Sequence, residues 1–284
     1  MDILKTKSDM QKWSKKKKKE SKTICLVPTM GYFHQGHLSL MEKGNPLCDE
    51  LVVSLFVNPT QFGPNEDLDA YPSNIENDLA LARKAGVTAV FLPNKKTMYP
   101  EKFQTEIKLQ HLPKFLCGKS RPIHFAGVAT VVTKLFNIVM PDIAIFGQKD
   151  YQQLQIIQQL VLDLDFDIKI IAGDIIREKD GLAMSSRNAY LSKPQRSSAL
   201  SLSRSLNLAR ELIAGGEKNP VAIRNRIETF IQSFPEINIE YISFCNPKTL
   251  EDIEIIEYQV LLALAVKVGK TRLIDNALMD YPLQ

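Results

Sequence analysis

The chain has 284 residues, 44% of them hydrophobic and 24% charged, and this balance predicts a packed globular protein of one large or two unequal domains. Its net charge is +4, but five consecutive lysines at 15–19 account for the excess, because without them 31 basic residues face 32 acidic ones. The longest apolar stretch, Val260 to Val266, is far shorter than the ~20 residues that span a bilayer, so we expect no membrane role.

The lysine run lies in a segment whose apolar residues, Met10 and Trp13, are spaced as on an amphipathic helix. Consecutive lysines can contact nucleic acid or an anionic membrane, but no aromatic residue or glycine is interleaved with these. We therefore favour a solvated helix face and expect no nucleic-acid partner.

Five short apolar runs in the first 175 residues have the length and composition of buried strands. They are 24–27, 51–57, 89–92, 143–146 and 168–171. Helical patterns alternate with them, at 36–43, 73–84, 127–140 and 150–163. This alternation predicts a doubly wound parallel sheet, a Rossmann-like α/β domain over residues 1–175 whose ligand binds beyond the carboxyl ends of the strands. Ser73 and Glu76 have the spacing of a capping box.

The pattern changes at about residue 176. A capping-box sequence at 192–195 predicts a helix that continues to about residue 214, and a second helix is expected over 220–233. Three strand-like segments then close the chain, at 237–244, 260–266 and 272–278. We expect a smaller α+β domain over residues 176–284.

Four cysteines, Cys25, Cys48, Cys117 and Cys245, are widely spaced and form no Cys-x-x-Cys pair. Neither a disulfide framework nor a zinc site of the usual spacing is therefore predicted. The first residues also lack the apolar core of a signal peptide. We expect a reduced, cytoplasmic protein.

Two of the four histidines, His34 and His37, follow the first expected strand and are interleaved with Gly31 and Gly36. Glycines let a backbone approach a ligand closely, and the unpaired N–H groups of a helix start attract phosphate. Imidazoles there can donate hydrogen bonds to phosphoryl oxygens as charge develops. Exposed histidines in a plain turn are the alternative, but the position at the end of a strand favours a phosphate site.

Lys149 occupies a comparable position, because an apolar strand runs into Gly147 and then into a helix start. A helix N-terminus prefers negative charge, so a lysine there either turns into solvent or shares a bound anion. The histidine pair at another strand end favours the shared anion, and we assign Lys149 as a phosphate ligand.

The segment 184–188, Met-Ser-Ser-Arg-Asn, supplies two hydroxyls and the guanidinium of Arg187, a set suited to a polyphosphate. By itself Ser-Ser-Arg is more often a turn with a surface arginine. Gln61 and Gln153 can bind hydroxyl and carboxylate groups without adding charge, although glutamines on separate loops are ordinarily polar surface.

Five motifs, in this order, resemble those of the pantothenate synthetase family, the pantoate–β-alanine ligases, within the adenylate-forming branch of the His-x-Gly-His nucleotidyltransferases. They are 28–37 (PTMGYFHQGH), 56–62 (FVNPTQF), 121–128 (RPIHFAGV), 146–154 (FGQKDYQQL) and 184–188 (MSSRN). Five separate matches in the expected order make coincidence an inadequate explanation.

The resemblance implies a role for each site residue. The implied catalytic residues are His37, His34, Lys149 and Arg187. The implied ATP-binding residues are Met30, Gly31, Tyr32, Phe33, His34, Gln35, Gly36, His37, Gly147, Gln148, Lys149, Asp150, Ile176, Met184, Ser185, Ser186 and Arg187. Gln61 and Gln153 are implied to bind the substrates, gripping the hydroxyls and carboxylate of pantoate. Asn58, Tyr71 and Arg121 are weaker candidates for the same pocket.

The reaction implied by the resemblance is ATP-dependent condensation of (R)-pantoate with β-alanine through pantoyl adenylate, with release of AMP and pyrophosphate. Mg²⁺ is the implied cofactor beside the substrate ATP, and a homodimer is the implied assembly. Two anions meet in the first step, so positioning and positive charge should dominate catalysis. Because the acyl adenylate hydrolyses readily, we expect residues 176–284 to cover the site as a lid.

Three positions depart from the family pattern. Gln148 and Cys117 stand where glutamate is common, and Asn77 precedes Asp78 where two acidic residues often occur. Fewer acidic groups near a magnesium nucleotide could alter metal affinity, so no metal ligand is assigned.

Two other functions stay open at this point. A nucleotidyltransferase that moves AMP onto a phosphorylated acceptor also uses paired histidines, but it would need an extra basic cluster for the acceptor phosphate. A non-catalytic nucleotide- or RNA-binding protein led by the lysine run would bind RNA in a salt-sensitive way without turning over ATP.

Overall fold

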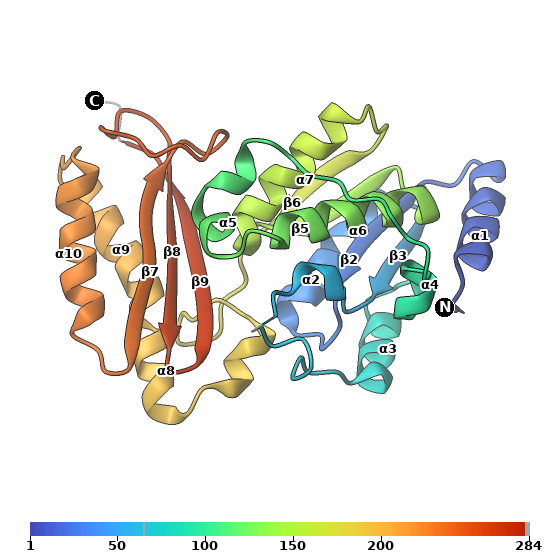
Figure 1. The fold of residues 1–284 in the computed structure, drawn as a ribbon, viewed down its shortest axis with the longest axis horizontal. Helices are drawn as coiled ribbons and strands as arrows, with labels where there is room; N and C mark the ends of the chain where they lie inside the picture. Colours follow the sequence, from blue (N-terminus) through green and yellow to red (C-terminus); the bar gives the residue numbers. More distant parts are fainter. Residues whose placement is uncertain (65, 282–284) are drawn as a thin grey trace. The chain divides into compact units, whose positions relative to one another are not determined.

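A computed structural model describes residues 1–64 and 66–281, and contacts within the chain divide it into two compact units (Figure 1). The first unit comprises residues 1–113, 121–148 and 153–174. The second comprises residues 114–120, 149–152 and the chain from 175 onward. Each unit has its own sheet and its own hydrophobic core.

In the described part of the first unit, six parallel strands form a sheet in the order β1-β4-β3-β2-β5-β6. The strands are β1 (Asp2–Leu4), β2 (Ile24–Thr29), β3 (Glu50–Leu55), β4 (Ala89–Phe91), β5 (Ile143–Gly147) and β6 (Lys169–Gly173). The helices are α1 (Lys7–Lys19), α2 (Gln35–Gly44), α3 (Ile75–Lys84), α4 (Lys95–Met98), α6 (His124–Val139) and most of α7 (Tyr151–Asp163). The predicted doubly wound α/β fold is confirmed.

Alternation along the strands explains why helices cover both faces of this sheet. Ile24 and Leu26 of β2 belong to a core shared with α1, α6 and α7, whereas Cys25 and Val27 belong to a second core shared with α2 and α3. Successive side chains of a strand point to opposite faces, so a strand buried on both faces is apolar along its whole length.

The strand register brings several carboxyl ends to one edge of the sheet. Thr29, the last residue of β2, pairs with Leu55, the last residue of β3. Gly147, the last residue of β5, pairs with Gly173 of β6. The segments that follow β2 and β3 therefore start from the edge at which open α/β sheets bind their ligands.

The second unit is built on an antiparallel sheet of three described strands, β7 (Ile237–Cys245), β8 (Val260–Val268) and β9 (Thr271–Met279). Three helices pack on this sheet: α8 (Lys193–Ala199), α9 (Ser201–Ala214) and α10 (Pro220–Gln232) (Figure 1). Leu206 of α9 and Ile227 of α10 share one core with Leu262 and Leu264 of β8. The short helix α5 (Leu116–Ser120) also belongs to this unit. The predicted α+β architecture is confirmed.

Two expectations about helix ends are wrong and one is confirmed. α3 is capped by the side chain of Asn74, which accepts the N–H of Asn77, and not by Ser73. The single helix expected after residue 192 is two helices, α8 and α9, which meet at Leu200. The capping box at 192–195 is present as predicted.

Several short elements were not predicted. β1 pairs with β4 and adds an edge strand to the sheet, but a strand of three residues has too short a hydrophobic pattern to be predicted. The 3₁₀ helices are η1 (Asn45–Leu47), η2 (Pro59–Gln61), η3 (Leu112–Lys114), η4 (Gln148–Asp150) and η5 (Ser186–Tyr190). Among the described residues, no helix has the length and apolar character needed to cross a membrane.

Candidate active site

The turn after β2, which leads to the histidine pair, has an unusual backbone. Gly31 and Tyr32 have φ angles of +89° and +55°, in the left-handed region that a tyrosine rarely adopts. The buried carboxylate of Asp78 on α3 accepts the N–H groups of Tyr32 and Phe33 at 2.8 and 2.7 Å. Asp78, which sequence analysis considered only as a metal ligand, therefore fixes the conformation of this turn.

His34 and His37 cap the start of α2 with their Nδ1 atoms. His34 Nδ1 accepts the N–H of Gly36 at 3.1 Å, and His37 Nδ1 accepts the N–H of His34 at 3.4 Å. The ring centroids are 4.1 Å apart. A ring nitrogen that accepts a hydrogen bond carries no proton, so each neutral imidazole holds its proton on Nε2. Both rings therefore keep an Nε2–H group as a hydrogen-bond donor.

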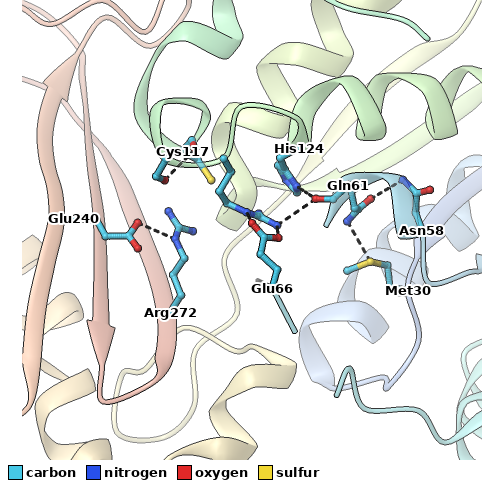
Figure 2. A network of polar contacts seen from close by, with 10 residues as sticks. Met30, Asn58, Gln61, Glu66, Cys117, His124, Glu240 and Arg272 are labelled. Carbon is cyan, nitrogen blue, oxygen red and sulfur yellow. Dashed lines mark hydrogen bonds and ion pairs between the residues drawn. The ribbon is translucent and has the colours of Figure 1, made fainter. Parts of the chain in front are cut away.

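Gln61, at the end of η2 after β3, has its amide oriented by Asn58. Asn58 Nδ2 donates to Gln61 Oε1 at 3.1 Å and to the Gly127 carbonyl at 3.2 Å, while its Oδ1 accepts from the Tyr99 hydroxyl at 2.7 Å. A backbone carbonyl can only accept, so the orientation of both amides is determined. Gln61 consequently directs its Nε2 donor toward the sulfur of Met30, 3.2 Å away, beside the histidine turn (Figure 2).

Arg121 and His124 both contact the backbone of the loop that carries Gln61. Arg121 forms an ion pair with Glu66 and donates to the Gln61 carbonyl at 3.4 Å. His124 Nδ1 lies 2.9 Å from the same carbonyl oxygen (Figure 2). Burial alone would raise the pKa of the Glu66 carboxyl, but the hydrogen bonds and charge of Arg121 outweigh burial and hold that pKa below its ordinary value. Arg121 thus supports the position of Gln61, and its expected role as a substrate contact stays a prediction.

Close packing explains why residue 127, in the same motif as Arg121 and His124, is a glycine. A Cβ atom at this position would lie 2.4 Å from the carbonyl oxygen of Thr60, closer than real Cβ atoms approach. Only a glycine therefore lets α6 pack directly against η2.

The second unit contains the segment 184–187 at the end of a short hairpin. The N–H of Met184 donates to the carbonyl of Ile176 at 2.9 Å, which makes these two predicted ATP-binding residues neighbours. Ser185 caps η5 by accepting the N–H of Arg187 at 3.3 Å. Lys149 belongs to this unit as well, and its amine lies 3.9 Å from the Asp150 carboxylate.

The remaining predicted residues fall in both units. Gln153 lies in the first turn of α7, in the first unit, and is half-buried. Tyr71 packs against the edge of the Phe62 ring, with centroids 6.1 Å apart. Gly147 and Gln148 end the β5 segment of the first unit.

Within the described residues, no group of three His, Cys, Asp or Glu side chains could hold a metal ion.

Comparison with known proteins agrees with these observations. A family model described as pantoate-beta-alanine ligase matches residues 2–278. The chain belongs to the pantoate–β-alanine ligase family. It is 58% identical to the pantothenate synthetase of Desulforapulum autotrophicum, over 99% of both chains, and 55% identical to that of Desulfatibacillum aliphaticivorans, over 99% of this chain and 100% of the other.

Solved structures of ligases from this family have the same fold. Pantothenate synthetase from Thermus thermophilus has a TM-score of 0.92 at 38% identity, covering 98% of this chain and 99% of that chain. The pantoate-beta-alanine ligase from Francisella tularensis, complexed with beta-gamma ATP and beta-alanine, has a TM-score of 0.81 at 33% identity, covering 98% and 97%. The family resemblance inferred from the five sequence motifs is confirmed.

Two residues that support the candidate site were missed by sequence analysis. Asp78 had a usable signal, since an acidic residue in the first turn of a helix often accepts backbone N–H groups. Tyr99 had none, because nothing in its local sequence shows that its hydroxyl reaches Asn58, 41 residues away.

Proposed function

We propose that this chain condenses (R)-pantoate with β-alanine at the expense of ATP, forming pantothenate, AMP and pyrophosphate through pantoyl adenylate. One observation carries the proposal in addition to family membership. A turn with two Nε2–H donors, His34 and His37, begins at Met30, and the Met30 side chain contacts the amide of Gln61. A phosphate-binding turn beside an amide that can bind hydroxyl and carboxylate oxygens suits a small hydroxy acid and ATP.

In the first step, a carboxylate oxygen of pantoate attacks the α-phosphorus of ATP, and the bond to the pyrophosphate oxygen breaks. Negative charge gathers on the phosphoryl oxygens, so donors and cations placed beforehand lower the barrier. We assign His37 as the hydrogen-bond or proton donor, His34 as its support, and Lys149 and Arg187 as neutralising cations. Gln61 and Gln153 hold the pantoate.

In the second step, the amine of β-alanine attacks the carbonyl carbon of the adenylate, and the carbon–oxygen bond to AMP breaks. Only the neutral amine has the electron pair for this attack. Water competes with the amine for the same carbon, so we propose that residues 176–284 act as a lid that excludes it.

Magnesium is proposed to arrive with ATP, since Mg²⁺ commonly binds substrate phosphates and keeps several waters. When bound it would neutralise phosphate charge. Both carboxylate oxygens of Asp78 accept backbone N–H groups of the histidine turn, so we leave this residue as a structural support and assign no metal ligand.

The decisive experiment supplies the purified chain with ATP, (R)-pantoate and β-alanine. We expect AMP and pyrophosphate in equal amounts, and without β-alanine a burst of about one pyrophosphate per site. Absence of AMP with all three substrates present would reject the proposal, and AMP transfer to a phosphorylated acceptor instead would favour the nucleotidyltransferase alternative.

We also propose a cytoplasmic homodimer, for which sedimentation equilibrium and cell fractionation are the tests.

A further inference from the structure

Asn276, on strand β9 of the second unit, contacts the backbone of Lys149. Its Nδ2 atom donates a hydrogen bond of 2.8 Å to the Lys149 carbonyl, across 127 residues of sequence. Asn276 as a residue is only 6% exposed. Residue 276 pairs with Ala263 of the central strand β8, so its own backbone is held by the sheet. Asn276 therefore connects a rigid strand to the peptide that carries the Lys149 amine.

The residue before it on β9, Asp275, anchors the hairpin that leads into 184–187. Its side chain is 1% exposed, and its carboxylate accepts two hydrogen bonds from Arg177, at 2.7 and 3.0 Å. Arg177 also donates to the Gly181 carbonyl at 3.1 Å and pairs with Ala183 across the hairpin. Adjacent residues of one strand thus hold both predicted phosphate-binding segments of this unit.

We propose that Asn276 is a positioning residue for Lys149 during adenylate formation. Asp275 and Asn276 together keep Lys149 at a fixed position relative to the 184–187 segment. The inference rests on the proposed function. A carboxamide suits the position because its donor matches the carbonyl oxygen, whereas a carboxylate would be repelled by that oxygen. Displacement of a charge-neutralising group by about 1 Å can slow a reaction considerably.

The test is Asn276→Asp, which keeps the shape of the side chain and removes the donor. We expect pyrophosphate release from ATP and pantoate in a single turnover to slow about tenfold or more. The reaction of preformed pantoyl adenylate with β-alanine should keep its rate, because phosphate charge is neutralised before that step. Asn238→Asp, the same change at an exposed position of β7 in the same sheet, should leave both rates unchanged.

A double-mutant comparison separates positioning from general damage. In a Lys149→Ala background, Asn276→Asp should cause no further slowing, because the group it positions is already gone. Equal slowing in both backgrounds, or equal slowing of both half-reactions, would overturn the inference, as would wild-type rates in Asn276→Asp. Asn276→Ala, with its melting temperature measured, repeats the test without a new charge. A wild-type chain that makes no pyrophosphate would instead overturn the proposed function itself.

Discussion

At the scale of single residues, the two ring nitrogens of each imidazole in the histidine pair have different roles, one in the fold and one in the proposed reaction. The Nδ1 atoms accept backbone N–H groups at the start of α2, and the Nε2–H groups are the donors that we assign to the reaction. Mutations can separate these roles, because asparagine is also a good helix N-cap but offers no imidazole donor.

Replacement of His37 by alanine should slow adenylate formation about 10²-fold, as for the loss of one transition-state donor. His34→Asn should also slow this step while leaving the melting temperature close to that of the wild type, since the cap of α2 is kept. Single-turnover pyrophosphate release and thermal unfolding measure the two effects. Full rates in His37→Ala would remove it from the mechanism.

The Glu66 carboxylate should make stability depend on acid pH. Its pKa is depressed in the folded protein, so the stabilisation it gives is present above its unfolded pKa of about 4.3 and is lost as pH falls through the folded value. We expect the free energy of unfolding to fall more steeply below pH ~4.3 in the wild type than in Glu66→Gln. Urea unfolding at a series of pH values measures this, and a stability gap that does not change with pH would contradict it.

At the scale of elements, the site depends on how closely α6 approaches η2. The approach lets the Gly127 carbonyl accept from Asn58, which in turn orients the Gln61 amide. The substrate recognition that we propose for Gln61 is therefore coupled to the packing of α6 against η2.

Gly127→Ala should lower the free energy of unfolding by about 1–3 kcal/mol, because the added methyl group forces α6 away from η2. The KM for pantoate should rise, since Gln61 loses its orientation. Gly147→Ala is the matched control for stability alone, because a Cβ there meets no atom within 4 Å. Unchanged stability and KM in Gly127→Ala would show that the loop adapts.

At the scale of the whole molecule, the lysine run has local ionic partners. Lys17 lies 2.5 Å from Glu50, and Lys18 lies 2.7 Å from Asp142. Glu50 is the first residue of β3 and Asp142 immediately precedes β5, so two of the five lysines bind α1 to the sheet of its own unit. This favours the solvated helix face over a nucleic-acid site.

Changing Lys15, Lys16 and Lys19 together to glutamine should leave the rate of AMP formation unchanged. Neither the wild type nor the triple variant should retain RNA at physiological salt, because no binding surface beyond the run is proposed. Filter binding over a range of salt concentrations checks this. Salt-sensitive RNA binding that the triple variant loses would revive the regulatory alternative.

The boundary between residues 1–175 and 176–284 stays a prediction, which limited proteolysis can test.

The sequence by itself determined the features that depend on local pattern. The strands β2, β3 and β5 are short apolar runs, the capping box at 192–195 is a four-residue signal, and the motifs proposed to bind phosphate are contiguous stretches. Each of these is specified within about a dozen residues, which is why alternation and motif order sufficed to predict the α/β fold and the family.

Only the tertiary structure decided which distant groups support the site. Asp78 accepts the N–H groups of Tyr32 and Phe33 across 46 and 45 residues, and Asn276 donates to Lys149 across 127 residues. No periodicity marks such a contact, because it exists only once helices and strands have packed in one register. The physical reason is that the hydrophobic pattern of a segment indicates which face of its helix or strand is buried. Which two polar side chains meet depends instead on how the buried faces of different elements pack together.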